Sequence, residues 1–246
     1  MKIAALINYC TNDYRFIKRV IDNIVPFTSQ IIVPVCDHYF TGEEENRELL
    51  EKTYTENPSA QFIEYEWDSK HNTRYWSNMS RLIGAHQLND DIDWILFLDA
   101  DEVIDTEMFI DFLKNTPLNL MSYKFLGYYY FREPIYQAIQ KEDCSVLCKR
   151  EFVNTDVFHT YHERGQYSEI LNVPKKENVI YNGLPMIHHY SWVRTKEQML
   201  KKVQTWWHKD DRNWKELVEK EFSHPFDGTD FVHGYQYITV ENKYNL

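Results

Sequence analysis

Short apolar runs alternate with longer amphipathic segments through the first hundred residues, and this alternation constrains the fold more than any other feature of the chain. Each run is nearly continuous, as is typical of a strand buried on both faces of a parallel sheet. Because right-handed crossovers join such strands, the pattern predicts an α/β fold with an open, doubly wound, mainly parallel sheet. The predicted strands cover residues 3–7, 31–35, 61–67 and 94–98, and the predicted helices cover residues 16–25, 43–56 and 77–88.

The alternation stops near residue 118, where strand-like stretches at residues 120–131 and 145–152 replace it. A C-terminal helix is predicted to start at Thr195, because Thr195 and Gln198 form a capping box ahead of apolar residues at helical spacing. We therefore predict one domain over residues 1–194, divided into halves at 1–117 and 118–194. A helical extension over residues 195–246 is expected to pack on it.

Composition excludes several classes of protein. The formal net charge of −11 gives no global field that attracts phosphate backbones or anionic lipid, so nucleic-acid binding is not favoured. The four cysteines form no C-x-x-C pair, and we expect reduced thiols in the core. No apolar stretch approaches the roughly 20 residues of a membrane span, and the first apolar run is too short for a signal peptide. A cytoplasmic protein without a membrane span is expected.

Polar residues follow three predicted strands where each one ends: at residues 8–12, at Asp37, and at Asp99 and Asp101. Ligands of doubly wound sheets bind beyond the carboxyl ends of the strands, so these loops are predicted to form the rim of a site. Asp99 and Asp101 lie two residues apart on a turn, where both carboxylates can reach one Mg²⁺ or Mn²⁺ ion. The alternative is a solvated acidic turn, or one in which Asp105 and Thr106 cap the next helix.

Residues 94–102, Trp-Ile-Leu-Phe-Leu-Asp-Ala-Asp-Glu, resemble the Asp-x-Asp motif of glycosyltransferases of the A-type fold, especially family 2. The resemblance implies that Asp99 lies near the ribose and the metal of a nucleotide sugar and that Asp101 binds the metal. Residues 80–85 are similar to the family's Ala-Arg-Asn-x-Gly element behind the donor, with Arg81 matching and Leu82 in place of asparagine.

Two strand-end segments match the same family less closely. Asn8 and Tyr9 take the position of its Pro-x-Tyr-Asn segment without the proline, which implies contacts to the donor base. Asp37 closes the second strand, where the family often places an acidic residue against the uracil or ribose. The alternative for Asp37 is an aspartate that caps a turn.

Two downstream segments extend the resemblance. Residues 187–194 are similar to the family's His-Tyr-x-Trp-x-Arg segment, which implies that His189, or else His188, is a metal ligand beside Asp99 and Asp101. Imidazole suits Mn²⁺ better than Mg²⁺. Arg194 is predicted to hold the diphosphate through charge-assisted hydrogen bonds, or alternatively to form a structural ion pair.

Residues 161–163, Tyr-His-Glu, are similar to a segment on the acceptor side of many bacterial family 2 enzymes. Glu163 is accordingly the predicted general base, which takes the proton of the acceptor hydroxyl, with Asp156 as the nearest alternative. Glu163 and Asp101 are the two predicted catalytic residues.

These features predict a metal-dependent glycosyltransferase that uses Mn²⁺ or Mg²⁺ and a nucleoside diphosphate sugar. Residues 1–117 would bind the donor, and residues 118–194 would bind a hydroxyl acceptor, expected to be a glycan or glycoconjugate. Inversion of the sugar rests on the family analogy. Two alternatives stay open. One is a nucleotidyltransferase of related topology, which normally has a glycine-rich basic loop that residues 8–13 lack. The other is a non-catalytic carbohydrate-binding protein that retains the fold.

Overall fold

The structure is a computed structural model and describes residues 1–153, 172–206 and 208–246. Its helices are α1 (Tyr14–Ile24), α2 (Arg47–Glu56), α3 (Thr73–Ala85), α4 (Thr106–Asn115), α7 (Lys196–Thr205) and α8 (Trp214–Glu221), with short 3₁₀ turns at Thr11–Asp13 and Arg150–Phe152. Its strands are β1 (Ile3–Asn8), β2 (Gln30–Cys36), β3 (Gln61–Tyr65), β4 (Trp94–Asp99), β5 (Glu102–Ile104), β6 (Ser122–Phe131), β7 (Tyr136–Lys149), β8 (Lys175–Val179), β9 (Ile187–Trp192) and β10 (Tyr237–Thr239).

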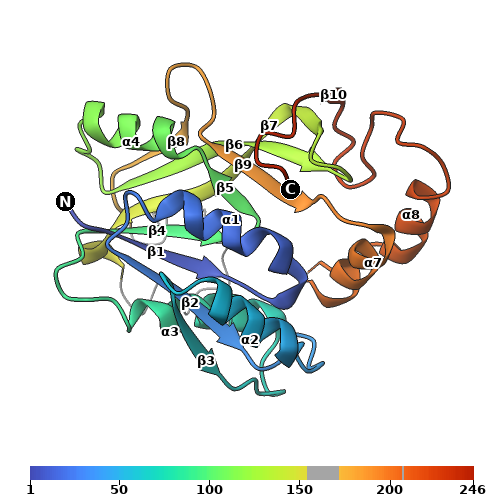
Figure 1. Cartoon of the computed structure of the whole chain (residues 1–246), viewed down its shortest axis with the longest axis horizontal. Coiled ribbons are helices and arrows are strands. Elements are labelled where there is room, and N and C mark those ends of the chain that lie inside the picture. Colours follow the sequence, from blue (N-terminus) through green and yellow to red (C-terminus); the bar gives the residue numbers. More distant parts are fainter. Residues whose placement is uncertain (154–171, 207) are drawn as a thin grey trace.

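The described strands form a single sheet in the order β3-β2-β1-β4-β7-β6-β9-β5, with β10 beside β7 and β8 beside β6. The first four strands of this order are parallel to one another. β7 then pairs antiparallel with both β4 and β6, whereas β9 lies parallel to β6 (Figure 1). The predicted α/β fold with a mainly parallel sheet is confirmed.

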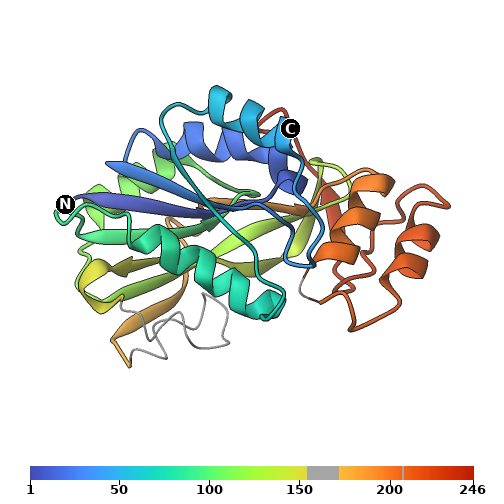
Figure 2. The same ribbon diagram turned by 90° about the horizontal axis from the view of Figure 1, so that it is seen from below.

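Helices cover both faces of the sheet, as a doubly wound arrangement requires. α1 and α2 lie on one face and α3 on the other, which Figure 2 shows edge-on. Alternate residues of β1 separate the two cores: Ala5 and Ile7 pack on the α1 side, and Ala4 and Leu6 pack on the α3 side. This alternation explains why β1 is apolar at every position.

The parallel register of β1 and β4 positions the site. Ile3 pairs with Trp94 at one end, and Asn8 pairs with Asp99 at the other. Both strands are buried along almost their whole length, so a slip of one residue would move apolar side chains off their cores. The register therefore places the two strand-end residues side by side.

Several element boundaries differ from the sequence-based predictions. β7 begins at Tyr136, nine residues before the predicted strand at 145–152, and ends in the 3₁₀ turn Arg150–Phe152. α2 starts at Arg47 rather than 43, because the Asn46 side chain caps it by accepting a hydrogen bond from the Leu49 N–H. α7 begins with the predicted Thr195–Gln198 capping box but ends at Thr205, so Trp206 lies beyond the helix.

Two expectations from composition can be compared with the structure. All four cysteines are free thiols, and three of them are buried, as predicted. None of the described helices combines the length and apolar character needed to cross a membrane.

We predict that Gly84→Ala lowers the free energy of unfolding by about 1–3 kcal/mol through overpacking. A Cβ at Gly84 would lie 2.8 Å from Pro34 Cγ and 3.1 Å from Leu6 Cδ2, because α3 packs closely on β1 and β2. Urea unfolding measures the change. Glu219→Ala, on the exposed face of α8, is the control and should shift stability by less than about 0.5 kcal/mol. A stabilised Gly84→Ala protein, as expected from its roughly 1 kcal/mol better helix propensity, would contradict the prediction.

Candidate active site

A cavity of about 650 Å³ opens at the carboxyl ends of β1 and β4. Its walls come from distant parts of the chain: the loops after β1 and β2, the start and middle of α3, strands β6, β7 and β9, and the segment from α7 to residue 233. The predicted site residues that line it are Asn8, Tyr9, Arg81, Asp99, Asp101, His189 and Arg194. A second cavity, of about 830 Å³, lies at the opposite end of β4 around Trp94 and contains none of them.

Asp99 is held by α3. Arg81 Nη2 donates to Asp99 Oδ1 at 2.8 Å, and the Arg81 side chain is only 6% exposed. The other end of the Arg81 guanidinium donates to the carbonyl of Ser77. Asp99 therefore lines the cavity with one oxygen already paired to a fixed cation.

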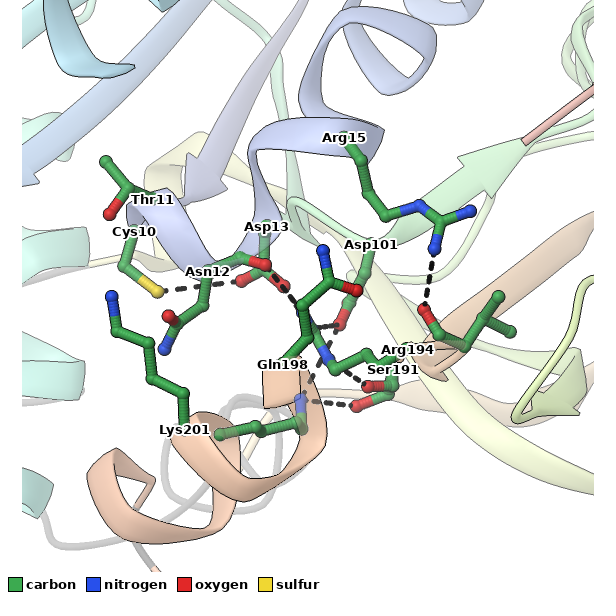
Figure 3. Close-up of polar contacts among 12 residues, drawn as sticks. Cys10, Thr11, Asn12, Asp13, Arg15, Asp101, Ser191, Arg194, Gln198 and Lys201 are labelled. Carbon is green, nitrogen blue, oxygen red and sulfur yellow. Dashed lines mark hydrogen bonds and ion pairs between the residues drawn. The ribbon is translucent and has the colours of Figure 1, made fainter. Parts of the chain in front are cut away.

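Asp101 is buried at the centre of the site, with only 4% of its surface exposed. Its Oδ1 lies 3.4 Å from His189 Nε2, and its Oδ2 lies 3.6 Å from Arg194 Nη2 and 3.9 Å from Lys202 Nζ. Figure 3 shows Arg194 beside this carboxylate. Burial favours the neutral acid, but His189, Lys202 and Arg194 outweigh it and hold the pKa of Asp101 well below its usual range.

The acidic turn is not a helix cap. Asp105 has that role, because its side chain accepts a hydrogen bond from the Met108 N–H at the start of α4. The side chains of Asp99 and Asp101 line the cavity instead. Helix capping therefore explains Asp105, but it does not explain the two aspartates of the Asp99-Ala100-Asp101 segment.

Strand parity separates the two neighbouring histidines on β9. His188 is buried with its Nδ1 2.8 Å from the Tyr130 hydroxyl, and its ring packs against Tyr128 and Tyr244. His189 points to the other face, lines the cavity and contacts the edge of the Tyr129 ring. Of the two predicted alternatives, His189 is the one that lines this cavity.

His189 is itself tuned by its surroundings. Burial alone would lower its pKa, but the Asp101 carboxylate and the Cys144 thiol raise the pKa of His189 well above its usual range. Its Nδ1 is buried and has no hydrogen-bond partner among the described residues. One nitrogen therefore faces a carboxylate, and the other is buried.

Arg194 lies at the junction of three segments and is almost fully buried. Its guanidinium contacts Asp13 Oδ1 and the Asn12 carbonyl in the loop after β1, and its Nε donates to the Ser191 carbonyl at 2.9 Å (Figure 3). These contacts match the structural ion pair that the sequence left open. The same side chain lines the cavity, so it remains placed to meet an anionic ligand.

Lys202 on α7 is a cation that the sequence analysis missed. Its Nζ donates to Ser191 Oγ at 2.9 Å, and its side chain is 14% exposed at the cavity wall. Burial and the nearby Arg194 charge lower the pKa of Lys202. The available signal was its position beside Met199 and Val203 on the buried side of α7, where an ordinary surface lysine is not expected.

The predicted donor-binding residues of the strand ends differ in their surroundings. Asn8 Oδ1 accepts a hydrogen bond from Ser80 Oγ at 3.1 Å at the cavity wall. The Tyr9 ring also lines the cavity, but its hydroxyl is used inside the protein, 2.7 Å from Thr53 Oγ1 on α2. Asp37 is not among the lining residues. Its Oδ1 accepts from the Trp67 N–H at 2.8 Å, which matches the alternative of a turn-forming aspartate.

A further pair of titratable side chains, Glu142 and His233, lines the cavity. Glu142 on β7 lines the cavity with its Oε1 3.5 Å from His233 Nδ1. The Tyr129 ring contacts both His233 and His189 edge-on, so it lies between this pair and Asp101. Sequence reasoning missed Glu142 because nothing local distinguishes it from a surface glutamate. Glu163, and its alternative Asp156, lie outside the described residues.

The predicted metal ligands are brought near one another without forming one compact set. Among the described residues, the group of three whose ligand atoms all lie within 4.8 Å of one another is Glu102, Cys144 and His189. Asp99 is outside it because Arg81 holds its carboxylate. Asp101 Oδ1 is buried without a hydrogen bond beside His189. Buried ligand atoms of this kind fit a divalent cation, and His189 is common to both sets.

No protein-family model matches the chain, and no curated protein matches it in sequence. Solved structures do match it. 4-Diphosphocytidyl-2C-methyl-D-erythritol synthase from Anaerococcus prevotii has a TM-score of 0.50 and 10% identity, covering 82% of this chain and 95% of that one. The inositol-1-phosphate CTP transferase from T. maritima has a TM-score of 0.50 and 8% identity, covering 80% and 94%. The chain therefore shares the α/β fold of these two proteins, and at this identity the likeness shows the fold alone.

We predict that acid destabilises the fold through His188. Burial, with the Lys243 charge, lowers the pKa of His188 to about 3, whereas an unfolded histidine titrates near about 6.5. The unfolded state therefore binds more protons between these two values. The stabilisation from neutral His188 is complete above about pH 6.5 and is lost as the pH falls, by at most about 1.4 kcal/mol per pH unit.

Urea unfolding between pH 7 and pH 4 measures this slope. His188→Phe keeps a ring in the core and should flatten the dependence, although it removes the acceptor of the Tyr130 hydroxyl. The control, His86→Gln at the exposed end of α3, should keep the slope of the unmodified protein. Equal slopes in the His188→Phe and unmodified proteins would contradict the assignment.

Proposed function

We propose that this protein is a metal-dependent glycosyltransferase that moves a sugar from a nucleoside diphosphate sugar to a hydroxyl acceptor. The observation that carries the proposal is the convergence on Asp101. Side chains from β9, from the turn that follows it and from α7 meet a buried carboxylate at the carboxyl end of β4, inside a cavity large enough for a ligand. In doubly wound sheets this is the position at which ligands bind.

The charge of the cavity supports a requirement for metal. Among the described residues, six carboxylates line it, against four lysine and arginine side chains. A donor diphosphate is strongly anionic, so it needs additional positive charge in such a cavity. A bound divalent ion would stabilise the charge that develops on the leaving nucleoside diphosphate. The predicted ligands for that ion are Asp99, Asp101 and His189, of which Asp101 and His189 are closest together.

The remaining roles follow from position along the cavity. Asn8, Tyr9 and Arg81 lie on the side of β1 and α3, where we place the nucleoside. Arg194 and Lys202 lie beside Asp101, where we place the diphosphate. The opposite wall has aromatic and polar side chains from β6, β7 and the C-terminal segment, suited to a sugar hydroxyl acceptor: Tyr129, Glu142, Trp206, His208 and His233.

A nucleotidyltransferase is the second candidate, because the two solved structures described above are named as a diphosphocytidyl-erythritol synthase and a CTP transferase. The loop after β1 argues against it here. Residues 8–13 contain no glycine, lysine or arginine, and Asp13 adds a negative charge. Thr11 in that loop contacts the buried Glu45, so a second carboxylate lies where a triphosphate would need cations. We therefore favour glycosyl transfer.

We predict that one nucleotide sugar, with Mn²⁺ present, raises the melting temperature of the protein. A ligand at about 100 times its Kd stabilises the native state by about 2.7 kcal/mol. The test is a thermal-shift panel of UDP-, GDP-, CMP- and TDP-sugars. Asp99→Asn should abolish the shift, because it removes a donor-side carboxylate, whereas Asp22→Asn on the exposed surface of α1 should keep it. A panel without any shift would refute the donor assignment.

The products separate the rival functions. A glycosyltransferase releases nucleoside diphosphate slowly from the donor even without an acceptor. A nucleotidyltransferase instead releases pyrophosphate from a nucleoside triphosphate and a sugar phosphate. Binding of sugar with neither product would indicate the non-catalytic alternative.

We also predict that Glu163→Gln reduces turnover by at least about 100-fold without weakening donor binding, since general-base catalysis typically contributes about 10²–10⁴-fold. Glu142→Gln is the competing variant, because Glu142 is a described carboxylate on the wall that we assign to the acceptor. Glu219→Gln on α8 is the neutral control. If Glu142→Gln loses turnover and Glu163→Gln retains it, the base is Glu142 and the sequence-based assignment fails.

A further inference from the structure

We propose that Glu102, Cys144 and His189 form a three-ligand site for a borderline divalent cation such as Zn²⁺ at the floor of the cavity. Their ligand atoms lie within 4.8 Å of one another. Glu102 is fully buried, Cys144 is 2% exposed, and His189 lines the cavity. This site differs from the one in the proposed function in its metal and in its ligands. It rests on the proposed function only for the role that the bound ion would have.

The sheet register explains how three distant residues meet. Cys144 is on β7, His189 on β9 and Glu102 on β5, and these strands lie in the order β7-β6-β9-β5. Glu102 and His189 are direct partners in the antiparallel pair of β5 and β9, so their side chains share a face. Cys144 must reach them across β6.

Gly127 on β6 makes that approach feasible. A Cβ at this position would lie 2.2 Å from Cys144 Sγ, a separation that two such atoms cannot adopt. The thiol therefore fills the space that a side chain on β6 would take. Any other residue at 127 would push Cys144 away from β9, so the glycine keeps the sulfur beside His189.

The two nitrogens of His189 have the arrangement expected of a metal ligand. Nε2 lies 3.4 Å from the Asp101 carboxylate, and Nδ1 is buried with no hydrogen bond to the part of the chain that the structure describes. Metal-binding histidines commonly direct their second nitrogen to a carboxylate, which fixes the ring and increases its basicity. We therefore assign Nδ1 to the metal and Asp101 to the role of orienting His189, in place of its predicted role as a direct ligand.

The ligand types select the ion. Thiolate and imidazole favour Zn²⁺ or Co²⁺ over Mg²⁺, which prefers oxygen ligands alone. Catalytic zinc sites have three protein ligands and an open position. Cys144 and His189 line the cavity and Glu102 does not, so an ion held by these three side chains would border the cavity. The glutamate is oriented as well, because it accepts a hydrogen bond from the Asp99 N–H at 3.0 Å.

Cobalt absorption tests the site without any assay of activity. Chelator-treated protein titrated with Co²⁺ should develop the near-ultraviolet charge-transfer band that only thiolate ligation gives. Cys144→Ser should abolish the band and weaken Zn²⁺ binding at least tenfold. Cys148→Ser is the matched control, because Cys148 is a buried thiol on the same strand outside the cluster, and it should keep the band.

Glu102→Gln provides a second variant that leaves the sulfur in place. It should retain the band and still weaken Zn²⁺ binding at least tenfold, which keeps the proposal testable if Cys144→Ser does not fold. Asp101→Asn should also retain the band, since Asp101 is assigned to orientation and not to the metal. Loss of the Co²⁺ complex in Asp101→Asn, with no thiolate band in any protein, would overturn the site in favour of the oxygen-rich set.

Failure of this site and failure of the proposed function give different results. If the thiolate band appears but no nucleotide sugar binds, the metal site stands and the glycosyltransferase assignment falls. If nucleotide sugars bind with Mn²⁺ and Co²⁺ gives no thiolate band, the metal site proposed here is wrong and the function stands.

Discussion

The burial of the Asp101 carboxylate is the constraint on which the site depends. A carboxylate removed from water costs several kcal/mol unless cations and hydrogen-bond donors compensate it. Here three positively charged or protonatable groups surround it, from β9, from the following turn and from α7. Removing one partner of a buried pair typically costs about 3–5 kcal/mol, because the other charge is left without compensation. The acidic turn is therefore stable only when the C-terminal part of the chain is in place.

This constraint connects the C-terminal segment to the first strands. Arg194 pairs with Asp13 as well as with Asp101, and Asn12 Nδ2 donates to Thr205 Oγ1 at 3.1 Å. Lys201 Nζ also donates to the Tyr39 hydroxyl at 2.6 Å. α7 is thus bound to the loops after β1 and β2, the same loops that line one side of the cavity. A helix that looks like an appendage in sequence forms a wall of the site.

The sequence was sufficient for those parts of the site that depend on local pattern. The apolar runs predicted β1 and β4, and the polar residues after them predicted where Asn8 and Asp99 would meet. The capping box predicted the start of α7. Each of these features depends on residues within a few positions of one another, or on the rule that parallel strands end at one edge. Strand parity on β9 then separates His189 from His188.

The other parts of the site depend on the registers of strand pairs, which cannot be predicted from the local sequence. β7 and β9 pair on either side of β6, and only their register brings Cys144, Gly127 and His189 together. Glu142 meets His233 across about ninety residues of chain, and Lys202 is identified as a site residue only by the buried acid that it faces. In the local sequence, an acid, a thiol or a lysine of a functional site cannot be distinguished from the same residue on the protein surface.

Ligand binding at this site must also rearrange charge. Arg194 and Lys202 are the cations best placed for a diphosphate, yet both already compensate Asp101. A diphosphate that takes them over leaves Asp101 with His189 as its main partner. A divalent ion on the far nitrogen of His189 would restore positive charge beside the carboxylate just where the phosphate removes it. Metal and diphosphate are thereby expected to bind with positive coupling, through one buried carboxylate that cannot be left without compensation.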